Sequence, residues 1–308
     1  MKASCKSSVC LVVLTRNPGR FWPRWCAAVQ QQQPAVDVVV VDSCSNDGTD
    51  FSNLPPGFGL LRVDPADFRH GGTRNLALEH LPPQTEWVVF MTQDALLADD
   101  AAIERLLAAF EDPDVCCAYG RQLPHTDASA FAAHARLFGY PAVSYTVGLE
   151  ARERMGLRAC FLSNSFAAYR LADLRALGGF PPDVILGEDM AVAARALLAG
   201  KRVAYVADAC VYHSHNYSAW QEFQRYFDTG VFHAREPWLL RAFGGAQGEG
   251  LRFVLSELRY LLRHAPWRLP QALWRTVCKW VGYRLGRLEA QLPVGLKKRL
   301  GMHRAYWG

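Results

Sequence analysis

The stretch WVVFMTQD, residues 87–94, is a run of apolar residues that ends abruptly in a polar triplet. A short apolar run rich in β-branched and aromatic residues is typical of a strand that is buried on both faces of a sheet. Thr92, Gln93 and Asp94 then stand where that strand ends. Because ligands of open α/β sheets bind at the carboxyl ends of the strands, this triplet is the first candidate for a functional loop.

Similar apolar runs alternate with stretches of helical spacing over residues 1–215, which is the pattern of an α/β sheet with crossover helices. Strands are predicted at residues 9–14, 36–41, 60–63, 87–91, 116–120, 202–206 and 210–213. Helices are predicted at residues 20–31, 73–80, 100–110 and 189–198. Residues 216–308 contain no predicted strand, and after a glycine-rich joint at 244–250 they show helical spacing at 251–262 and 270–288. The chain therefore divides into an α/β region and a helical one.

Composition agrees with a folded protein that stays in the cytoplasm. Half of the 308 residues are hydrophobic and a fifth are charged, as in ordinary globular chains. The nine cysteines, from Cys5 to Cys278, are scattered without the spacing of a zinc site, which favours reduced thiols. The run at 9–14 is too short for the core of a signal peptide, and no apolar run approaches the roughly 20 residues of a spanning helix.

Charge is distributed unevenly along the chain. Residues 251–308 carry a net charge of +10, whereas residues 1–250 carry −5. Among the cations of the basic region stand large aromatic residues that include Trp267, Trp274, Trp280, Tyr283 and Trp307. Basic helices with aromatic residues are typical of membrane-surface binding, so we expect contact with an anionic membrane; a solvated subdomain or a dimer face is the alternative. No nucleic-acid motif is present, and no nucleic acid is expected as a partner.

Two more polar loops follow predicted strands. Thr15, Arg16 and Asn17 come after the first strand, and DSCSNDGT at 42–49 comes after the second. Each loop alone is equally compatible with an ordinary turn or helix cap, but three of them at one sheet edge favour a binding site. The glycine-rich phosphate loops GxGxxG after the first strand and GxxxxGK[ST] are absent. A diphosphate would therefore have to be held by a metal and by cationic side chains.

These loops, together with HGGTRN at 70–75 and GED at 187–189, resemble in their order the motifs of glycosyltransferase family 2. The resemblance covers about residues 9–215 and implies the GT-A fold, a mixed, mostly parallel sheet flanked by helices, here with a C-terminal helical appendage. It implies a nucleotide-sugar-binding catalytic domain at 1–215 and a helical, basic region at 216–308 for acceptor or membrane-surface contact. FRHGGTRN at 68–75, TQDA at 92–95, YHSHNYS at 212–218 and RYFDTG at 225–230 are similar to bacterial rhamnosyltransferases of surface polysaccharide and lipopolysaccharide synthesis.

The resemblance also implies the residues that bind the nucleotide sugar. Thr15, Arg16 and Asn17 would border the base, and Asp42 and Asp47 would contact base and ribose, although Asp42 could instead cap its own loop through Ser45 or Asp47. The remaining predicted donor-binding residues are Asp67, Gly72, Arg74, Asn75, Gln93, Asp94, Asn164 and Glu188. Gly71 and Gly72 would let the backbone approach the ligand, and Arg170 would touch the donor unless residues 164–170 form a packed strand.

Asp94 is the predicted ligand of a divalent metal, Mg²⁺ or Mn²⁺, since such cations take carboxylate oxygens together with substrate phosphates. The family's usual triplet is Asp-x-Asp, and here Thr92 replaces the first acid. His213 or His215 could complete the metal shell or donate to the leaving diphosphate, because residues two apart in extended chain face the same way. The alternatives are a helix cap at Asp94 for residues 95–110 and a structural pair of histidines.

Asp189 is the predicted catalytic base, again by resemblance, with Glu188 as a neighbour that tunes it. A sugar hydroxyl is a poor nucleophile at neutral pH and needs a positioned carboxylate to take its proton. The alternative is that both acids only satisfy the first turn of the following helix.

The implied reaction is inverting transfer of a sugar, by resemblance L-rhamnose from dTDP-β-L-rhamnose, to a hydroxyl of a saccharide or lipid-linked saccharide. We expect an enzyme that is peripheral on the inner face of the cytoplasmic membrane. Other donors remain open, namely UDP-galactofuranose, UDP-glucose or a UDP-N-acetylhexosamine. A sugar nucleotidyltransferase would need a glycine-rich loop with Arg and Lys after the first strand, which TRNPGR at 15–20 does not resemble. A non-catalytic membrane-surface protein would not need both Asp94 and Asp189.

Overall fold

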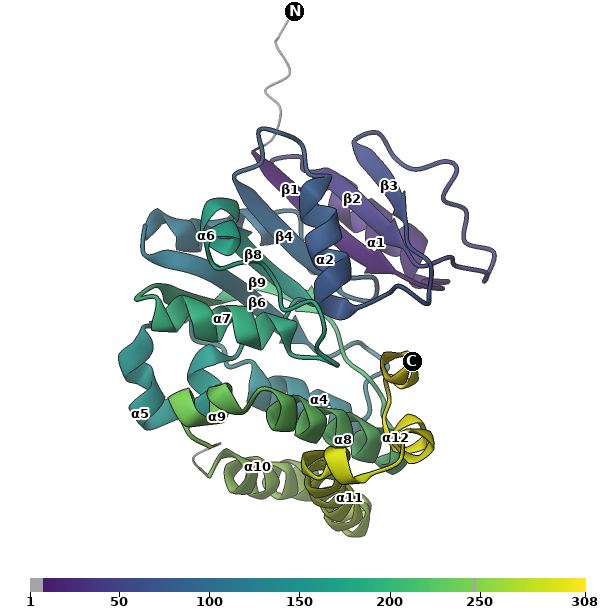
Figure 1. The fold of residues 1–308 in the computed structure, drawn as a ribbon, viewed down its shortest axis with the longest axis vertical. Helices are drawn as coiled ribbons and strands as arrows, with labels where there is room; N and C mark the ends of the chain where they lie inside the picture. The colour runs from purple at the N-terminus through teal and green to yellow at the C-terminus, as the bar shows by residue number, and fades with distance from the viewer. Residues whose placement is uncertain (1–7, 246–247) are drawn as a thin grey trace, which may run out of the picture.

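The computed structural model describes residues 8–245 and 248–308, which fold around one nine-stranded sheet (Figure 1). The strand order is β3-β2-β1-β4-β8-β6-β9-β5, and β7 pairs with β9 outside this order. The strands are β1 Val9–Thr15, β2 Asp37–Asp42, β3 Phe58–Arg62, β4 Trp87–Thr92, β5 Leu96–Leu97, β6 Val115–Leu123, β7 Tyr145–Val147, β8 Phe166–Arg170 and β9 Arg202–Tyr212. The longest ladders, β1 with β2, β1 with β4 and β6 with β9, are parallel, while β8 runs antiparallel to β4 and β6. The predicted mixed, mostly parallel α/β sheet is confirmed.

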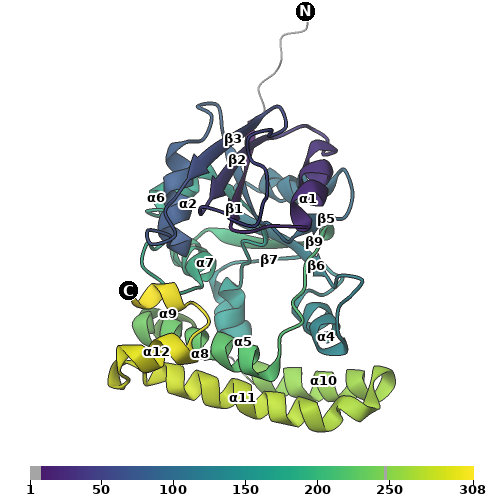
Figure 2. The ribbon, with the colours of Figure 1, turned by 90° about the vertical axis from the view of Figure 1, so that its right-hand side faces the viewer.

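Helices cover both faces of the sheet (Figures 1 and 2). One face packs against α2 His70–Glu79, α6 Leu171–Ala176 and α7 Glu188–Leu198, and the other packs against α1 Phe21–Gln30 and α3 Ala102–Leu107. Successive residues of β1 alternate between these two cores, and all of them from Cys10 to Val13 are completely buried. Burial on both faces is the reason that the central strands read as unbroken apolar runs.

Several boundaries differ from the sequence prediction. Residues 202–206 and 210–213, predicted as two strands, form the single strand β9, whose pairing with β6 shifts register between Gly120 and Arg121. The irregularity coincides with the break in the apolar pattern. The very short strands β5 and β7 were not predicted, because two or three residues show no periodicity. Helices α4 Ala130–Gly139 and α5 Arg152–Met155 were also missed.

The C-terminal region is helical, as predicted. It contains α8 Ala219–Arg235, α9 Pro237–Phe243, α10 Glu249–His264, α11 Leu269–Arg287 and α12 Val294–Leu300. Ser218 and Gln221 form a reciprocal capping box that fixes the start of α8. The predicted joint at 244–250 includes residues 246–247, which lie outside the described residues, as does Cys5; α10 begins inside this joint at Glu249. The other eight cysteines are free thiols.

Helices α8 and α11 pack against each other through glycines, so that their backbones approach closely. A β-carbon added to Gly286 would lie 2.0 Å from the Phe227 carbonyl oxygen, and one added to Gly282 would lie 2.4 Å from that of Phe223. On the facing helix, a β-carbon at Gly230 would lie 2.3 Å from the Tyr283 carbonyl oxygen. Only residues without a side chain fit this contact, which holds α11 against α8.

We predict that Gly286→Ala lowers the free energy of unfolding by about 1–3 kcal/mol or more, because the backbone oxygen of Phe227 can yield only by separating the helices. Thermal and urea denaturation of the purified variant would measure the loss. Gly295→Ala in α12 is the matched control, since no atom lies within 4 Å of a β-carbon there. Equal stability of the two variants would contradict the close packing of α8 on α11.

Candidate active site

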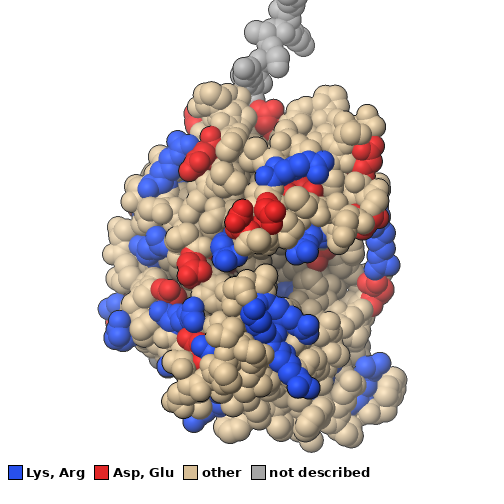
Figure 3. Space-filling model, turned by 45° about the vertical axis from the view of Figure 1, so that its right-hand side comes forward, with Lys and Arg blue, Asp and Glu red and all other residues tan. Residues whose placement is uncertain are grey.

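Two adjoining clefts lie at the sheet edge where β1, β2 and β4 end. The first has a volume of about 570 Å³ and the second about 720 Å³. His70, Arg74 and Thr92 line both, so the two clefts meet at these residues. Figure 3 shows a hollow between the sheet and the C-terminal helices, with Lys and Arg side chains near its opening. This is the edge at which the polar loops were predicted to converge.

Hydrogen bonds connect the loops that follow β1, β2 and β4 beside the first cleft. The Gln93 side chain accepts a hydrogen bond from the Arg16 amide at 2.8 Å and donates to the Arg16 carbonyl at 3.0 Å. Asn17, at φ 52°, accepts from the Asn46 amide at 2.8 Å. Thr15, Arg16 and Gln93 line the cleft, as predicted for a nucleotide pocket.

The structure places Asp42 and Asp47 in structural contacts instead of in the lining. Asp42 is completely buried and accepts hydrogen bonds from Thr15 Oγ1 at 3.2 Å and from Ser45 Oγ at 2.5 Å. Asp47 accepts from the Gly19 and Thr49 amides at 2.8 and 3.1 Å. For Asp42 the geometry matches the alternative interpretation, a cap of its own loop through Ser45.

Other residues that were predicted to bind the nucleotide sugar also do not line the first cleft. Asn75 does not face the cleft, because its side chain donates to and accepts from the backbone of Phe180, at 2.8 and 2.9 Å. Gly71 permits a close approach to backbone and not to ligand, since a β-carbon there would lie 1.8 Å from the Pro181 carbonyl oxygen. Asp67 and Gly72 lie beside the cleft without lining it. Arg170 pairs with Trp87 at the opposite end of β4, away from the site.

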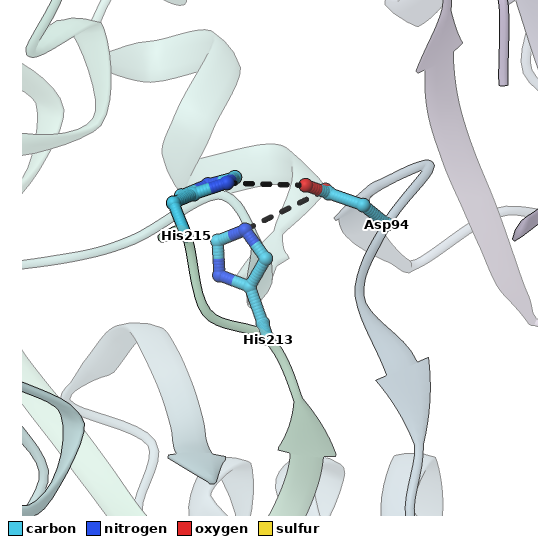
Figure 4. Close-up of side chains that lie close together, drawn as sticks. All are labelled: Asp94, His213 and His215. Carbon is cyan, nitrogen blue, oxygen red and sulfur yellow. Dashed lines mark ion pairs between the residues drawn. The ribbon is translucent and has the colours of Figure 1, made fainter. Parts of the chain in front are cut away.

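Asp94, His213 and His215 converge at the second cleft (Figure 4). Asp94 follows β4, and two residues later Leu96 of β5 pairs with Tyr212 at the end of β9. That short antiparallel pairing brings the histidines beside Asp94, with Nε2 of His213 3.5 Å from Oδ1 and Nδ1 of His215 3.7 Å from Oδ2. Asp94 does not cap a helix, because the next helix begins only at Ala102.

The protonation of this cluster suits a metal ion. Burial lowers the pKa of His213, and it lowers the pKa of His215 to about 4, so both imidazoles are neutral at pH 7. Gln122 Oε1 also accepts from Arg136, so it acts as the acceptor of the 2.8 Å bond from Nδ1 of His213. That bond leaves the Nε2 lone pair facing Asp94, which is the outer-shell arrangement of metal-binding histidines.

Glu188 and Asp189 begin α7 and face the second cleft together with Asn164. Oδ2 of Asp189 accepts from the Asn164 amide at 3.0 Å, and Oδ1 accepts from the Met190 amide at 2.8 Å. Glu188 is buried and forms an ion pair with Arg74 at 3.0 Å. The Asn164 side chain also donates to Glu188 at 3.2 Å, so the backbone and the side chain of one residue bind the two acids.

The two neighbouring acids have opposite pKa shifts. Burial and the negative charge of Glu188 raise the pKa of Asp189 to about 6, against the two amides that stabilise its anion. Burial opposes ionisation of Glu188 too, but Arg74 and the other groups around it hold the pKa of Glu188 below its ordinary value. Glu188 is thus a fixed anion, whereas Asp189 can exchange a proton near neutral pH, as a general base must.

Sequence reasoning missed several residues of the two clefts. The second cleft is also lined by Gln122, Arg136, Tyr140, Phe161, Tyr217, Arg225 and His233. The first is also lined by Phe68, Arg69, Val184, Ile185 and residues 302–306. The motifs at 68–75, 212–218 and 225–230 contain Phe68, Arg69, Tyr217 and Arg225. The others come from the interiors of helices and strands or from distant segments, where no motif marks them.

The sequence and the fold were compared with known proteins. A family profile described as glycosyltransferase like family 2 matches residues 24–227. The O-antigen chain rhamnosyltransferases RfbN of Salmonella typhimurium (strain LT2) and WbaN of Salmonella anatum are each 46% identical over 305 residues, covering 97% of this chain and 96% of theirs.

Solved structures of low identity share the fold. The mannosyltransferase PcManGT from Pyrobaculum calidifontis, in complex with GDP-Man and Mn²⁺, superimposes with a TM-score of 0.57 at 21% identity, over 99% of this chain and 86% of that one. TarS 1–349 of S. aureus with UDP-GlcNAc has a TM-score of 0.53 at 16% identity, over 92% and 91%. The chain therefore belongs to the glycosyltransferase family 2-like proteins and is a glycosyltransferase with the GT-A fold.

Proposed function

We propose that this protein is an inverting rhamnosyltransferase that moves L-rhamnose from dTDP-β-L-rhamnose to a hydroxyl of a saccharide acceptor in lipopolysaccharide synthesis. The observation that carries the proposal is the 46% identity to two O-antigen chain rhamnosyltransferases over 97% of this chain. The site agrees with it chemically, since the first cleft can take a nucleotide and the second can take the two sugars beside a basic carboxylate.

In this proposal Asp189 takes the proton of the acceptor hydroxyl as that oxygen attacks the anomeric carbon. The bond from that carbon to the diphosphate oxygen breaks in the same displacement, so configuration inverts and the nucleoside diphosphate leaves. Asn164 and the Met190 amide hold the Asp189 carboxylate in place, and Arg74, at the junction of the clefts, faces the departing charge.

Asp94, His213 and His215 are the residues that would hold a divalent cation. Their mixed oxygen and nitrogen donor set suits Mn²⁺ better than Mg²⁺, which prefers oxygen ligands. When bound, such an ion would stabilise the negative charge of the leaving diphosphate. Because Thr92 stands at the first acidic position of the family's usual Asp-x-Asp triplet, Asp94 is the one carboxylate of this cluster.

The exposed face of α10, α11 and the turn between them is the proposed membrane-contact surface. Trp267, Trp274 and Trp280 are 74%, 61% and 64% exposed, and Leu273 and Val277 lie on the same side at helical spacing. Arg284 lies over the ring of Trp280. No helix among the described residues is long and apolar enough to cross a membrane, so the proposed contact is peripheral.

A donor panel tests the proposed function. We predict that the purified protein with Mn²⁺ and a suitable saccharide acceptor releases dTDP from dTDP-β-L-rhamnose and turns over UDP-sugars far more slowly. Asp189→Asn should lower the transfer rate by about 10²–10⁴-fold, because the amide cannot accept the proton. Asp114→Asn is the control, since Asp114 is exposed just before β6, at the sheet edge opposite the site. Full activity of Asp189→Asn would rule out its role as base.

The raised pKa of Asp189 adds a pH test to the same experiment. A base must be deprotonated, so kcat/KM for the acceptor should fall as the pH drops through about 6 and should be level above it. For an ordinary aspartate, kcat/KM would fall only near pH 4. A fall at that lower pH would contradict the environment described for Asp189.

Metal binding can be measured without turnover. We predict that Asp94→Asn weakens Mn²⁺ binding by at least about tenfold, because the amide removes the one anionic ligand of the cluster. Electron paramagnetic resonance of free Mn²⁺ in titrations of the apoprotein would give the affinity, with Asp114→Asn as control. Undiminished Mn²⁺ affinity of Asp94→Asn would place the metal elsewhere.

Vesicle sedimentation tests the membrane surface. We predict that the wild type binds vesicles with anionic phosphatidylglycerol and not pure phosphatidylcholine, and that the triple variant Trp267→Ala, Trp274→Ala, Trp280→Ala binds at least about tenfold more weakly. Trp220→Ala, on α8 and 48% exposed, is the control. Equal binding of the triple variant and the wild type would refute this surface.

A further inference from the structure

Residues 302–306, which follow α12, form one wall of the first cleft. They belong to the C-terminal region, yet they lie opposite Thr15, Arg16 and Gln93. Figure 1 shows this yellow end of the chain between the sheet and α8. The first cleft is therefore lined both by the α/β region and by a segment that is distant in sequence.

A buried carboxylate on α8 holds this wall in place. Asp228 has no exposed surface, and its Oδ2 accepts hydrogen bonds from the Met302 and His303 amides at 3.1 and 3.0 Å. The same oxygen lies 2.7 Å from Nδ1 of His303. Among the described residues no Lys or Arg forms an ion pair with Asp228. Because a buried carboxylate needs hydrogen-bond partners, the two amides and the His303 ring are what stabilise Asp228 within the described part of the chain.

The contact with Asp228 determines which atom of His303 is free. Since Asp228 accepts from Nδ1, the second ring nitrogen, Nε2, remains available, and it has no protein partner within the described part of the chain. A quarter of the His303 side chain is exposed, and the residue lines the cleft. The pair is thus a carboxylate and an imidazole, with the carboxylate fixing the orientation of the ring.

His303 also lies near the junction of the two clefts. Its ring meets the ring of His70 edge to face with centroids 4.9 Å apart, and His70 lines both clefts. If the nucleoside occupies the first cleft and the sugar the second, the diphosphate that joins them must pass this junction. The described residues that line the first cleft include four arginines, Arg16, Arg69, Arg74 and Arg304, and no Asp or Glu.

We propose that His303 is a donor-contact residue that binds the diphosphate of the nucleotide sugar as an imidazolium, with Nε2 donating to the diphosphate and Nδ1 donating to Asp228, which positions the ring. The inference rests on the proposed function only in requiring a nucleoside diphosphate donor, not a particular sugar. It gives the C-terminal region a part in donor binding in addition to acceptor or membrane contact. It also provides one of the cationic side chains that a chain without a glycine-rich phosphate loop requires.

Calorimetric titration of the full-length protein with dTDP, UDP and the two free nucleosides tests the proposal. We expect His303→Ala to weaken binding of the diphosphate by about 10- to 100-fold, the effect of one hydrogen bond to a charged group, and to leave the nucleoside affinity unchanged. His80→Ala, an exposed histidine at the end of α2, is the control. Asp228→Asn should reproduce part of the loss in wild type and add nothing to His303→Ala.

The outcomes separate the two proposals. If the wild type binds a nucleoside diphosphate but His303→Ala binds it equally well, or loses diphosphate and nucleoside affinity in the same proportion, the contact is overturned while the transferase proposal stands. A further loss on adding Asp228→Asn to His303→Ala would reduce Asp228 to a purely structural role. If the wild type binds neither dTDP nor UDP, both proposals fail.

Discussion

The buried ion pair between Arg74 and Glu188 joins the two halves of the site. It connects α2, beside the first cleft, to α7, beside the second, and both side chains are almost fully buried. A buried pair of this kind contributes little net stability, but removing one partner costs about 3–5 kcal/mol because the other charge is left uncompensated. Arg74 also donates to the His70 carbonyl at 2.8 Å, so the start of α2 is fixed by the same guanidinium.

The same pair determines how the acids can act. Arg74 keeps Glu188 ionised, and the charge of Glu188 then raises the pKa of Asp189 beside it. Asn164 touches both acids, and its Oδ1 accepts from the Tyr169 hydroxyl at 2.6 Å, which fixes the amide from the core side. The proposed general base therefore owes its raised pKa to burial and to a neighbouring anion whose own charge is balanced by Arg74. The chemistry at Asp189 depends on an arginine more than one hundred residues earlier in the chain.

Much of the fold and part of the site were predictable from the sequence, for identifiable physical reasons. Strands buried on both faces leave apolar runs, and parallel strands bring their polar ends to one edge, which located Thr15, Gln93 and Asp94. Asn75 and Gly71 were misinterpreted because a side chain or a glycine that serves a close backbone contact looks the same in sequence as one that serves a ligand. The approach of residues 302–306 to the first cleft leaves no local pattern at all.

The net charge of the C-terminal region is larger than the charge that its surface exposes. Arg275 and Lys279 are buried and pair with Glu222 of α8, and Lys297 pairs with Glu289 at 2.6 Å, so these cations fasten helices together. Arg275 and Lys279 belong to the same interface as the glycine contact between α8 and α11. Only part of the net charge of +10, which suggested binding to a membrane surface, is therefore exposed for such a contact. The aromatic residues outside this interface, and not the cations within it, define the exposed face, because Trp274 and Trp280 of α11 remain 61% and 64% exposed.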